Sequence, residues 1–354
     1  MHISRRQFVA LSAATGVAVM GGRLHARPLA ARRAAEFFAW RSAGTHALVA
    51  LGRTGDDLSL VGGNSVVLTI KGETLLVDTK QAVIAPALRR EMQPRAGTLV
   101  RVLNTHHHFD HAGGNGSFHA DAPLMAHPKA AERIGASREA FLAQLDQKIG
   151  ALEVSKVEGA QAAAADAKSF RDNLANLPGD ALTPKEPWTP QTKLAVGGTP
   201  VTLLHYGPGH TDNDLVVHVP SENLLVTGDL VFNGLHPYFD VEGGATITGW
   251  LGALKRMRTL CNDKTVVVPG HGDVGGPAII DTQIAYLNAV HRTVAKAIAD
   301  GTPREDVVKM TLPDRDAYLL KFAQPFLWGG VFDELSRGKK DDAPKAPAGT
   351  PAGA

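Results

Sequence analysis

The chain has 354 residues, of which 44% are hydrophobic and 20% are charged, and its formal net charge is +2. This balance is that of a globular protein with a sizeable core. Because part of the positive charge lies in the N-terminal segment, the rest is close to neutral and does not indicate a nucleic-acid partner. The single cysteine, Cys261, excludes an intramolecular disulfide and a cysteine-rich zinc site.

The N-terminus carries the features of an export signal. Ser4 to Val9 reads Ser-Arg-Arg-Gln-Phe-Val and leads into an uncharged, moderately apolar run, Val9 to Met20, which is too short to span a bilayer as a helix. The pattern resembles a twin-arginine signal. It implies a signal peptide over residues 1–26, export by the twin-arginine translocase to the periplasm, and no stable membrane anchor. The alternative is the basic, amphipathic start of a cytosolic protein.

Short β-type runs alternate with helical patterns along the next part of the chain. The predicted strands are His46 to Leu51, Ser65 to Ile70, Thr74 to Val77, Leu99 to Leu103, Val201 to Leu204, Leu215 to Val219, Leu224 to Val226 and Thr265 to Val268. The predicted helices are Ala82 to Met92, Ile247 to Leu260 and Ile279 to Ala299. Several strands are nearly all apolar, which indicates that both of their faces are covered. The mixture predicts an α/β chain with helices outside sheets.

One stretch interrupts this rhythm. Lys129 to Asn176 is rich in Ala, Glu, Gln and Lys at helical spacing, so we expect an inserted helical pair, with its Pro-rich return, over about residues 129–190. The insertion is either a lid beside the active site or an inert surface feature. It would divide a domain at 45–300, followed by a helical extension at 301–340 and a disordered tail at 341–354.

The most informative stretch follows the predicted strand Leu99 to Leu103. Within six positions it holds His106, His107, His108, Asp110 and His111. Imidazole nitrogens and carboxylate oxygens are ligands of zinc and similar divalent metals. On an extended segment alternate side chains point the same way, so His106 and His108 can reach one metal. Asp110 and His111 suit a second metal, and His107 is expected to point elsewhere.

Three later segments repeat one pattern, a predicted strand followed by a ligand-type residue in a Gly-rich turn. The residues are His210, Asp229 and His271. Glycine beside each of them permits a tight turn and a close approach. Singly each is weak, because a lone buried histidine is more often a hydrogen-bonded core residue. Together with the histidine-rich stretch, they indicate a common metal site.

These ordered motifs, over about residues 45–275, resemble the metallo-β-lactamase-fold metallo-hydrolase superfamily. The resemblance implies an αββα four-layer sandwich of two mixed sheets flanked by helices, with the metals at one edge. It further implies that one metal is held by His106, His108 and His210, that a second is held by Asp110, His111 and His271, and that Asp229 bridges both. Asp78, after the strand Thr74 to Val77, fits a structural aspartate near the metals.

The chemistry that the resemblance implies is hydrolysis. Two Zn²⁺ ions, with Fe or Mn as alternatives, would share a hydroxide that attacks a small ester, thioester, lactone or lactam substrate. Asp110 would orient the hydroxide and move a proton. True zinc β-lactamases usually carry cysteine or serine where this chain has Asp229, so lactamase activity is less expected. His236 and Tyr238 follow Asp229 closely and are candidates for substrate contact, with a packed loop as the alternative.

Two other functions stay open on the sequence alone. One is an oxidoreductase similar to the persulfide dioxygenases, with a single iron held by two His and one Asp, because ligand sets overlap between metals. The other is a periplasmic metal-binding accessory protein without turnover. Two equivalents of zinc favour hydrolysis, whereas one iron with oxygen uptake favours the oxidoreductase.

Overall fold

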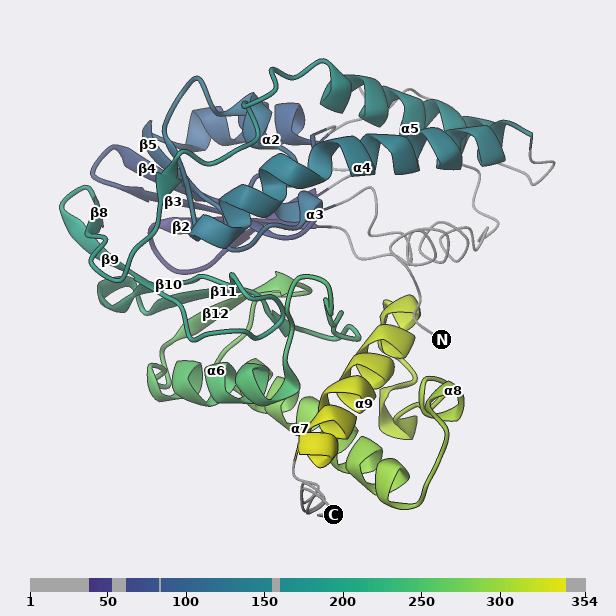
Figure 1. Cartoon of the computed structure of the whole chain (residues 1–354). Helices are drawn as coiled ribbons and strands as arrows, with labels where there is room; N and C mark the ends of the chain where they lie inside the picture. The colour runs from purple at the N-terminus through teal and green to yellow at the C-terminus, as the bar shows by residue number, and fades with distance from the viewer. Residues whose placement is uncertain (1–37, 53–61, 83, 155–159, 342–354) are drawn as a thin grey trace, which may run out of the picture.

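The computed structural model describes residues 38–52, 62–82, 84–154 and 160–341 (Figure 1). The predicted signal peptide at 1–26 lies outside these residues, as does the predicted tail from residue 342 onward. In the described part of the chain, no helix has the length and apolar character needed to cross a membrane.

The first sheet has seven strands in the order in which they occur along the chain. They are β1 (Phe38–Ser42), β2 (Ala47–Gly52), β3 (Ser65–Ile70), β4 (Glu73–Val77), β5 (Thr98–Leu103), β6 (Leu124–Ala126) and β7 (Glu186–Pro187). Strands β1 to β4 pair antiparallel, and β4 to β7 pair parallel. The predicted strands Ser65 to Ile70 and Thr74 to Val77 form the hairpin β3–β4, where Lys71 and Gly72 form the turn with positive φ.

The second sheet has five strands in the order β12-β11-β10-β9-β8. They are β8 (Leu194–Val196), β9 (Thr199–Leu204), β10 (Val216–Val219), β11 (Leu224–Phe232) and β12 (Val266–His271). Only β11 and β12 pair parallel. Strand β11 is buried along its whole length. Its register against β12 shifts on both sides of Gly228, which has a φ of +52° and packs against Thr105.

Helices cover the outer face of each sheet (Figure 1). The first group consists of α2 (Ala85–Met92), α3 (Phe109–Ala112), α4 (Pro128–Glu153) and α5 (Ala160–Ala175); the second of α6 (Ile247–Thr259), α7 (Ala278–Ala299), α8 (Arg304–Val307) and α9 (Gln324–Asp341). Short 3-10 turns are η3 (Gln93–Arg95), η4 (Asn115–Ser117), η5 (Pro220–Glu222), η6 (Pro313–Arg315) and η7 (Lys321–Ala323). The predicted αββα sandwich of two mixed sheets is confirmed.

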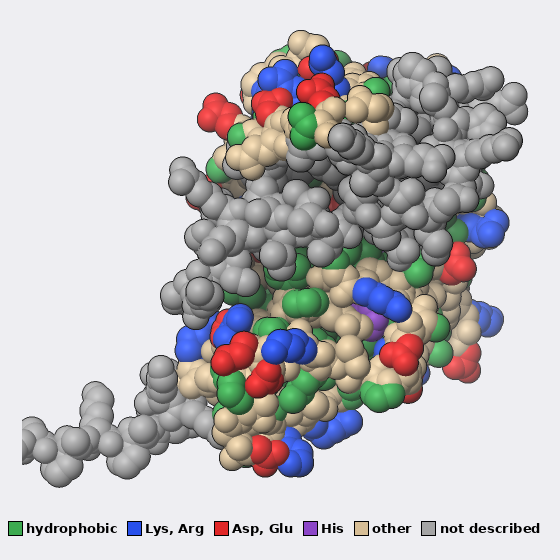
Figure 2. Space-filling view, turned by 90° about the vertical axis from the view of Figure 1, so that its right-hand side faces the viewer, with side chains coloured by type: hydrophobic (Ala, Val, Ile, Leu, Met, Phe, Trp, Pro, Cys, Tyr) green, Lys and Arg blue, Asp and Glu red, His purple; other side chains and the backbone are tan. Residues whose placement is uncertain are grey.

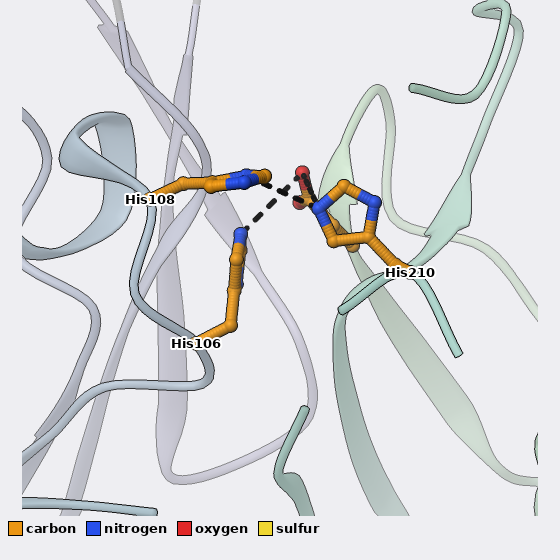
Figure 3. Close-up of side chains that lie close together, drawn as sticks. His106, His108 and His210 are labelled. Atoms are coloured by element: carbon orange, nitrogen blue, oxygen red, sulfur yellow. Dashed lines mark hydrogen bonds and ion pairs between the residues drawn. The ribbon is translucent and has the colours of Figure 1, made fainter. Parts of the chain in front are cut away.

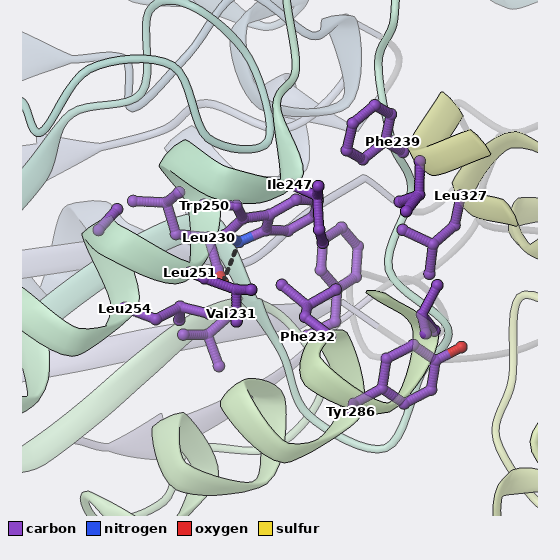
Figure 4. Close-up of a cluster of buried hydrophobic side chains, with 14 of the residues drawn as sticks. Leu230, Val231, Phe232, Phe239, Ile247, Trp250, Leu251, Leu254, Tyr286 and Leu327 are labelled. Carbon is purple, nitrogen blue, oxygen red and sulfur yellow. Dashed lines mark hydrogen bonds between the residues drawn. The ribbon is translucent and has the colours of Figure 1, made fainter. Parts of the chain in front are cut away.

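Three apolar cores hold these layers together. One lies between the sheets, one beneath α2, α4 and α5, and one between the second sheet and α6, α7 and α9. Trp250 of α6 is central to the last core: it is fully buried and its Nε1–H donates to Leu230 O at 2.9 Å (Figure 4). Leu327 of α9 packs into the same core, so the C-terminal extension is part of the sandwich.

The helical insertion is a hairpin of α4 and α5, drawn as the pair that projects from the first sheet in Figure 1. Arg138 of α4 ties the two helices together, because its guanidinium donates to the carbonyls of Leu174, Ala175 and Leu177 at the end of α5. The first turn of α4 follows β6 directly, so the base of the insertion begins at the same edge where β5 ends.

Candidate metal centre

The structure brings all seven predicted ligands together at one edge of the sandwich. Five elements or loops supply them: the loop after β5, α3, the loop between β9 and β10, β11 and β12. Nitrogen and oxygen atoms within 4.8 Å of one another form two groups, namely His106, His108, His210 and Asp229, and Asp110, His111 and His271. We call the three histidines of the first group the first cluster, and the second group the second cluster.

The backbone of the histidine-rich stretch differs from the extended segment that we predicted. Residues 105–107 form a bend, and His108 is the cap residue of α3. His106 and His108 still converge, but they do so through different ring atoms, Nε2 of His106 and Nδ1 of His108. The bend is held by Thr105, whose backbone N–H and hydroxyl donate to the Asp78 carboxylate at 2.8 Å.

His106 and His210 both face one carboxylate oxygen of Asp229, and His108 faces His210 (Figure 3). His210 Nε2 lies 3.1 Å from His108 Nδ1 and 3.6 Å from Asp229 Oδ2. His106 Nε2 lies 3.8 Å from the same oxygen. Three imidazoles and one carboxylate therefore surround a common point.

The second cluster also faces the carboxylate of Asp229. His271 Nε2 lies 3.1 Å from Asp110 Oδ2 and 3.3 Å from His111 Nε2. Asp229 Oδ1 is 3.1 Å from His111 Nε2, and its Oδ2 is 3.4 Å from His271 Nε2. Asp229 thus lies between the two clusters and reaches both, as the bridging position implies.

Hydrogen bonds on the far side of the rings orient the ligands. His111 Nδ1 donates to Asp78 Oδ2 and His210 Nδ1 donates to Tyr238 O, both at 2.8 Å. His106 Nδ1 lies 3.0 Å from the Thr105 hydroxyl, which itself donates to Asp78. With Nδ1 occupied in this way, Nε2 of each ring is left for a metal. Asp78 therefore lies at the back of the site, where the resemblance puts a structural aspartate.

The electrostatics of the two clusters differ. Burial lowers the pKa of His210 to about 4, and burial with the neighbouring His111 lowers the pKa of His106 well below its usual range. Burial also disfavours the charged form of His271, but Asp229 and Asp110 outweigh it and raise the pKa of His271 to about 9. In the metal-free protein, protons on the second cluster offset the charge of the two carboxylates.

The residues fit divalent metal ions. His106 Nε2 is buried and has no hydrogen-bond partner among the residues that the structure describes. Buried polar atoms are normally paired, so an unpaired nitrogen aimed into this donor set points to a ligand. Backbone glycines close the site tightly: a Cβ at Gly63 would lie 2.1 Å from the His111 ring, and one at Gly270 would lie 1.9 Å from Asp229 Oδ1.

The two predicted substrate residues have different surroundings. The Tyr238 ring lies 5.9 Å from the His108 ring, beside the first cluster. His236 is fully buried, and its ring nitrogens bond the Tyr286 hydroxyl at 2.8 Å and the Gln324 amide at 2.7 Å. With both nitrogens engaged and no exposed surface, His236 joins the loop after β11 to α7 and α9. This corrects the expectation that it contacts substrate, and it matches the packed-loop alternative.

Sequence reasoning missed one polar group at the site, Asp240. Its Oδ2 accepts from His108 Nε2 at 2.9 Å and lies 3.5 Å from His107 Nε2. Its only signal in the sequence is that it lies in the segment after Asp229. His107 lies outside the two clusters, as expected, and its backbone N–H donates to Asn213 Oδ1 at 3.1 Å.

Comparison with known proteins gives the site its context. Residues 58–271, more than half of the chain, match the Metallo-beta-lactamase superfamily. A crystal structure of a metallo-beta-lactamase from Erythrobacter litoralis has the same fold, with a TM-score of 0.50, 15% identity, and coverage of 72% of this chain and 97% of that one.

Curated relatives share shorter stretches. A type 2 metallo-beta-lactamase of Bacteroides fragilis is 26% identical over 32% of this chain and 45% of its own length. A probable hydroxyacylglutathione hydrolase of Schizosaccharomyces pombe is 26% identical over 56% of this chain and 58% of its own length. The chain thus spans less than two thirds of these relatives. The family match, the αββα sandwich and the two His/Asp clusters agree, and the chain belongs to the metallo-beta-lactamase superfamily.

Proposed function

We propose that this protein is a dinuclear, zinc-dependent hydrolase of a small ester, thioester or lactone, with a lactam as the less favoured substrate. The observation that carries the proposal is the place of Asp229, one buried carboxylate between two complete ligand clusters. Metal content per chain separates this proposal from the mononuclear iron alternative, because ligand sets overlap between metals. The N-terminal Ser4 to Val9 pattern alone supports the further proposal that the protein works in the periplasm.

Each cluster would hold one ion. His106, His108 and His210 would bind the first, Asp110, His111 and His271 the second, and Asp229 both. When bound, such a pair supplies Lewis acidity and lowers the pKa of coordinated water toward about 7. The chain's own hydrogen bonds orient the ligand rings, because they fix the ring nitrogens that face away from the metal positions.

Asp110 is the residue best placed to move a proton. Its side chain is 25% exposed, whereas that of Asp229 is only 4% exposed, so Asp110 alone of the two faces the approach of substrate. Burial opposes its charge, but His111 and His271 lower the pKa of Asp110 below its usual range. It is therefore a carboxylate at neutral pH that can accept a hydrogen bond from an attacking water and orient it, and we propose that it passes the proton of that water to the leaving group as the bond breaks.

The substrate class is proposed from the residue at position 229 and from the names of the relatives. On the face of the molecule shown in Figure 2, a histidine side chain is visible beside a Lys or Arg side chain and hydrophobic neighbours. The names of the relatives include both lactam and thioester hydrolases. An aspartate at position 229 removes the thiolate or hydroxyl ligand typical of true β-lactamases, which favours esters and thioesters.

The test is a substrate panel with metal analysis. Protein loaded with zinc or with iron is assayed on esters, thioesters, lactones and lactams, and the metal bound per chain is measured in parallel. We expect two zinc ions per chain and hydrolysis that falls at least about 100-fold in Asp110→Asn. Asp263→Asn, an exposed aspartate, is the matched control. One iron per chain with oxygen uptake, or full activity of Asp110→Asn, would refute the proposal.

A further inference from the structure

A polar group beside the first cluster has no part in the proposed chemistry. It comprises His107, His108 and Asp240, whose ligand-type atoms lie within 4.8 Å of one another. His108 belongs to both sets, because its Nδ1 faces His210 and its Nε2 faces Asp240. A ring that offers Nδ1 to a metal must carry its proton on Nε2, and Asp240 Oδ2 at 2.9 Å accepts that proton.

The His107 ring also faces this carboxylate. Asn213 Oδ1 accepts from the backbone N–H of His107, and the amide nitrogen of Asn213 lies nearer to His107 Nδ1, at 3.1 Å, than its Oδ1 does, at 3.3 Å. When the amide nitrogen donates to Nδ1, the ring proton is on Nε2, which lies 3.5 Å from Asp240 Oδ2. Oδ1 of Asp240 accepts from Gly243 N at 2.8 Å. One buried carboxylate is therefore hydrogen-bonded by His108 and Gly243 and has the His107 ring beside it.

Glycine at position 243 is required for this packing. A Cβ there would lie 1.9 Å from Asp240 Oδ2 and 3.0 Å from the His107 ring. The backbone at Gly243 is therefore in close contact with the carboxylate of Asp240 and limits where its Oδ2 can lie.

The group is anchored in the helical insertion. Asn213 also donates to Asp212 Oδ1 at 2.9 Å, and Asp212 Oδ2 accepts from Arg133 of α4 at 2.8 Å. Arg133 in addition donates to Glu242 O at 3.2 Å. The base of α4 therefore holds both loops that carry the group, the one around Asp212 and the one from Asp240 to Gly244.

We propose that Asp240 and His107 are positioning residues of the first metal, which set the tautomer and the angle of His108, and that α4 holds them in place through Arg133 and Asp212. His107 acts through Asp240 and not on the metal itself. In this proposal the insertion is neither a lid nor an inert feature. It stabilises the loops that position one half of the metal centre. The inference rests on the metal-binding part of the proposed function.

The test uses Co²⁺ as the probe, because its visible absorption reports ligand geometry. Full-length protein is loaded with cobalt, and the amount bound, the absorption bands and the rate of loss to a chelator are measured. We expect Asp240→Asn to weaken retention of one of two cobalt ions about 10- to 100-fold and to change one set of bands. His107→Phe, which keeps a ring without its N–H, should weaken the same ion several-fold.

The double variant separates positioning from general damage. If His107 acts through Asp240, the effect of His107→Phe disappears in the Asp240→Asn background. Arg133→Gln should speed loss of the same ion, whereas His119→Ala, an exposed histidine elsewhere, should change nothing. An unfolding measurement on each metal-free variant checks that the variant folds. If Asp240→Asn does not fold, His107→Phe alone still tests the inference.

Three results would overturn the inference. They are unchanged cobalt retention and spectra in His107→Phe and Asp240→Asn, additive effects in the double variant, and a third cobalt ion that is lost with His107. The last would mean that a metal, not a proton, lies between His107 and Asp240. Because the readout is metal binding, loss of hydrolysis on every substrate would refute the proposed function and leave this inference standing.

Discussion

Asp78 and Asp240 each accept a hydrogen bond from a ligand histidine, on the side of the ring that faces away from the metal position. The structure that holds each carboxylate in place differs between the two. Asp78 directly follows β4 of the first sheet, and its oxygens accept from Thr105 and from His111 at 2.8 Å. Asp240 lies in a loop after β11 and depends on the neighbouring loop and on α4 for its place. The half of the site around His111 is therefore fixed by strand pairing, whereas the half around His108 is fixed by loops that an insertion braces.

This difference has a physical consequence. A β-sheet edge keeps its geometry as long as the sheet is folded, but loops open locally at lower cost. We therefore expect the second cluster to be preformed, and the first to respond more readily to changes far from the metals. The following predictions test this contrast.

The largest effect should come from Asp229→Asn, which affects both halves at once. The amide keeps the shape but lacks the charge that faces His111, His210 and His271. Loss of a bridging ligand forfeits several kcal/mol of transition-state stabilisation, so we expect kcat/KM to fall on the order of 1000-fold and bound zinc to fall below two per chain. Steady-state kinetics with metal analysis measure this, and two tightly bound ions with normal turnover would contradict it.

Asp78→Asn should affect the second cluster selectively. Asn tolerates the positive φ of 60° at this position and keeps one acceptor, but it removes the charge that fixes His111 Nδ1–H. We expect one of two ions to be held about 10- to 100-fold more weakly. The cobalt bands that change should be those that stay unchanged in Asp240→Asn. If both variants perturb the same bands, the two halves are not independent.

The sequence predicted the ligands because they repeat one local pattern. His210, Asp229 and His271 each follow a β-type run and sit beside glycine, so the fold that pairs those runs also gathers the ligands. The bend at 105–107 could not be predicted in this way, since Asp78 imposes it from another strand. His236 was misjudged because its partners, Tyr286 and Gln324, come from helices outside the motifs.

The Asp240 group was hidden for the same reason. The residues 107, 133, 213 and 240 are far apart in sequence, and no local pattern links His107 to the other three. Contacts made between loops depend on the assembled sandwich. Sequence patterns therefore predicted what lies at the ends of strands, and they failed where loops meet.

On the rigid side of the site, Lys80 should make stability depend on pH. Its ammonium is fully buried and donates to Ala50 O and Gly63 O. Burial lowers the pKa of Lys80 from 10.5 to about 7, although Asp78 and Asp110 oppose this. Between about pH 7 and about pH 10 the unfolded chain holds the extra proton, so the free energy of unfolding rises with pH.

The measurement compares the metal-free protein with Lys80→Met by urea unfolding. From about pH 7 to about pH 9.5 the wild type should gain on the order of 2 kcal/mol relative to the variant. Below about pH 7 the lysine is charged in both states, and the difference should be constant. A difference that is flat across the whole range would show that the ammonium stays charged in the folded protein.

The smallest effect should come from the loop side, through Glu334 of α9. Its carboxylate accepts from Ile247 N at 2.6 Å and from the Thr248 hydroxyl at 3.0 Å, so it caps the start of α6 just after the loop that carries Asp240. Glu334→Gln should cost about 1 kcal/mol of unfolding free energy, and Glu132→Gln on the exposed face of α4 should cost less. If loops hold the first cluster, Glu334→Gln should also speed loss of the same cobalt ion as Asp240→Asn. If Glu334→Gln instead speeds loss of the other ion, the second cluster, and not the first, is the half of the site that responds to distant changes.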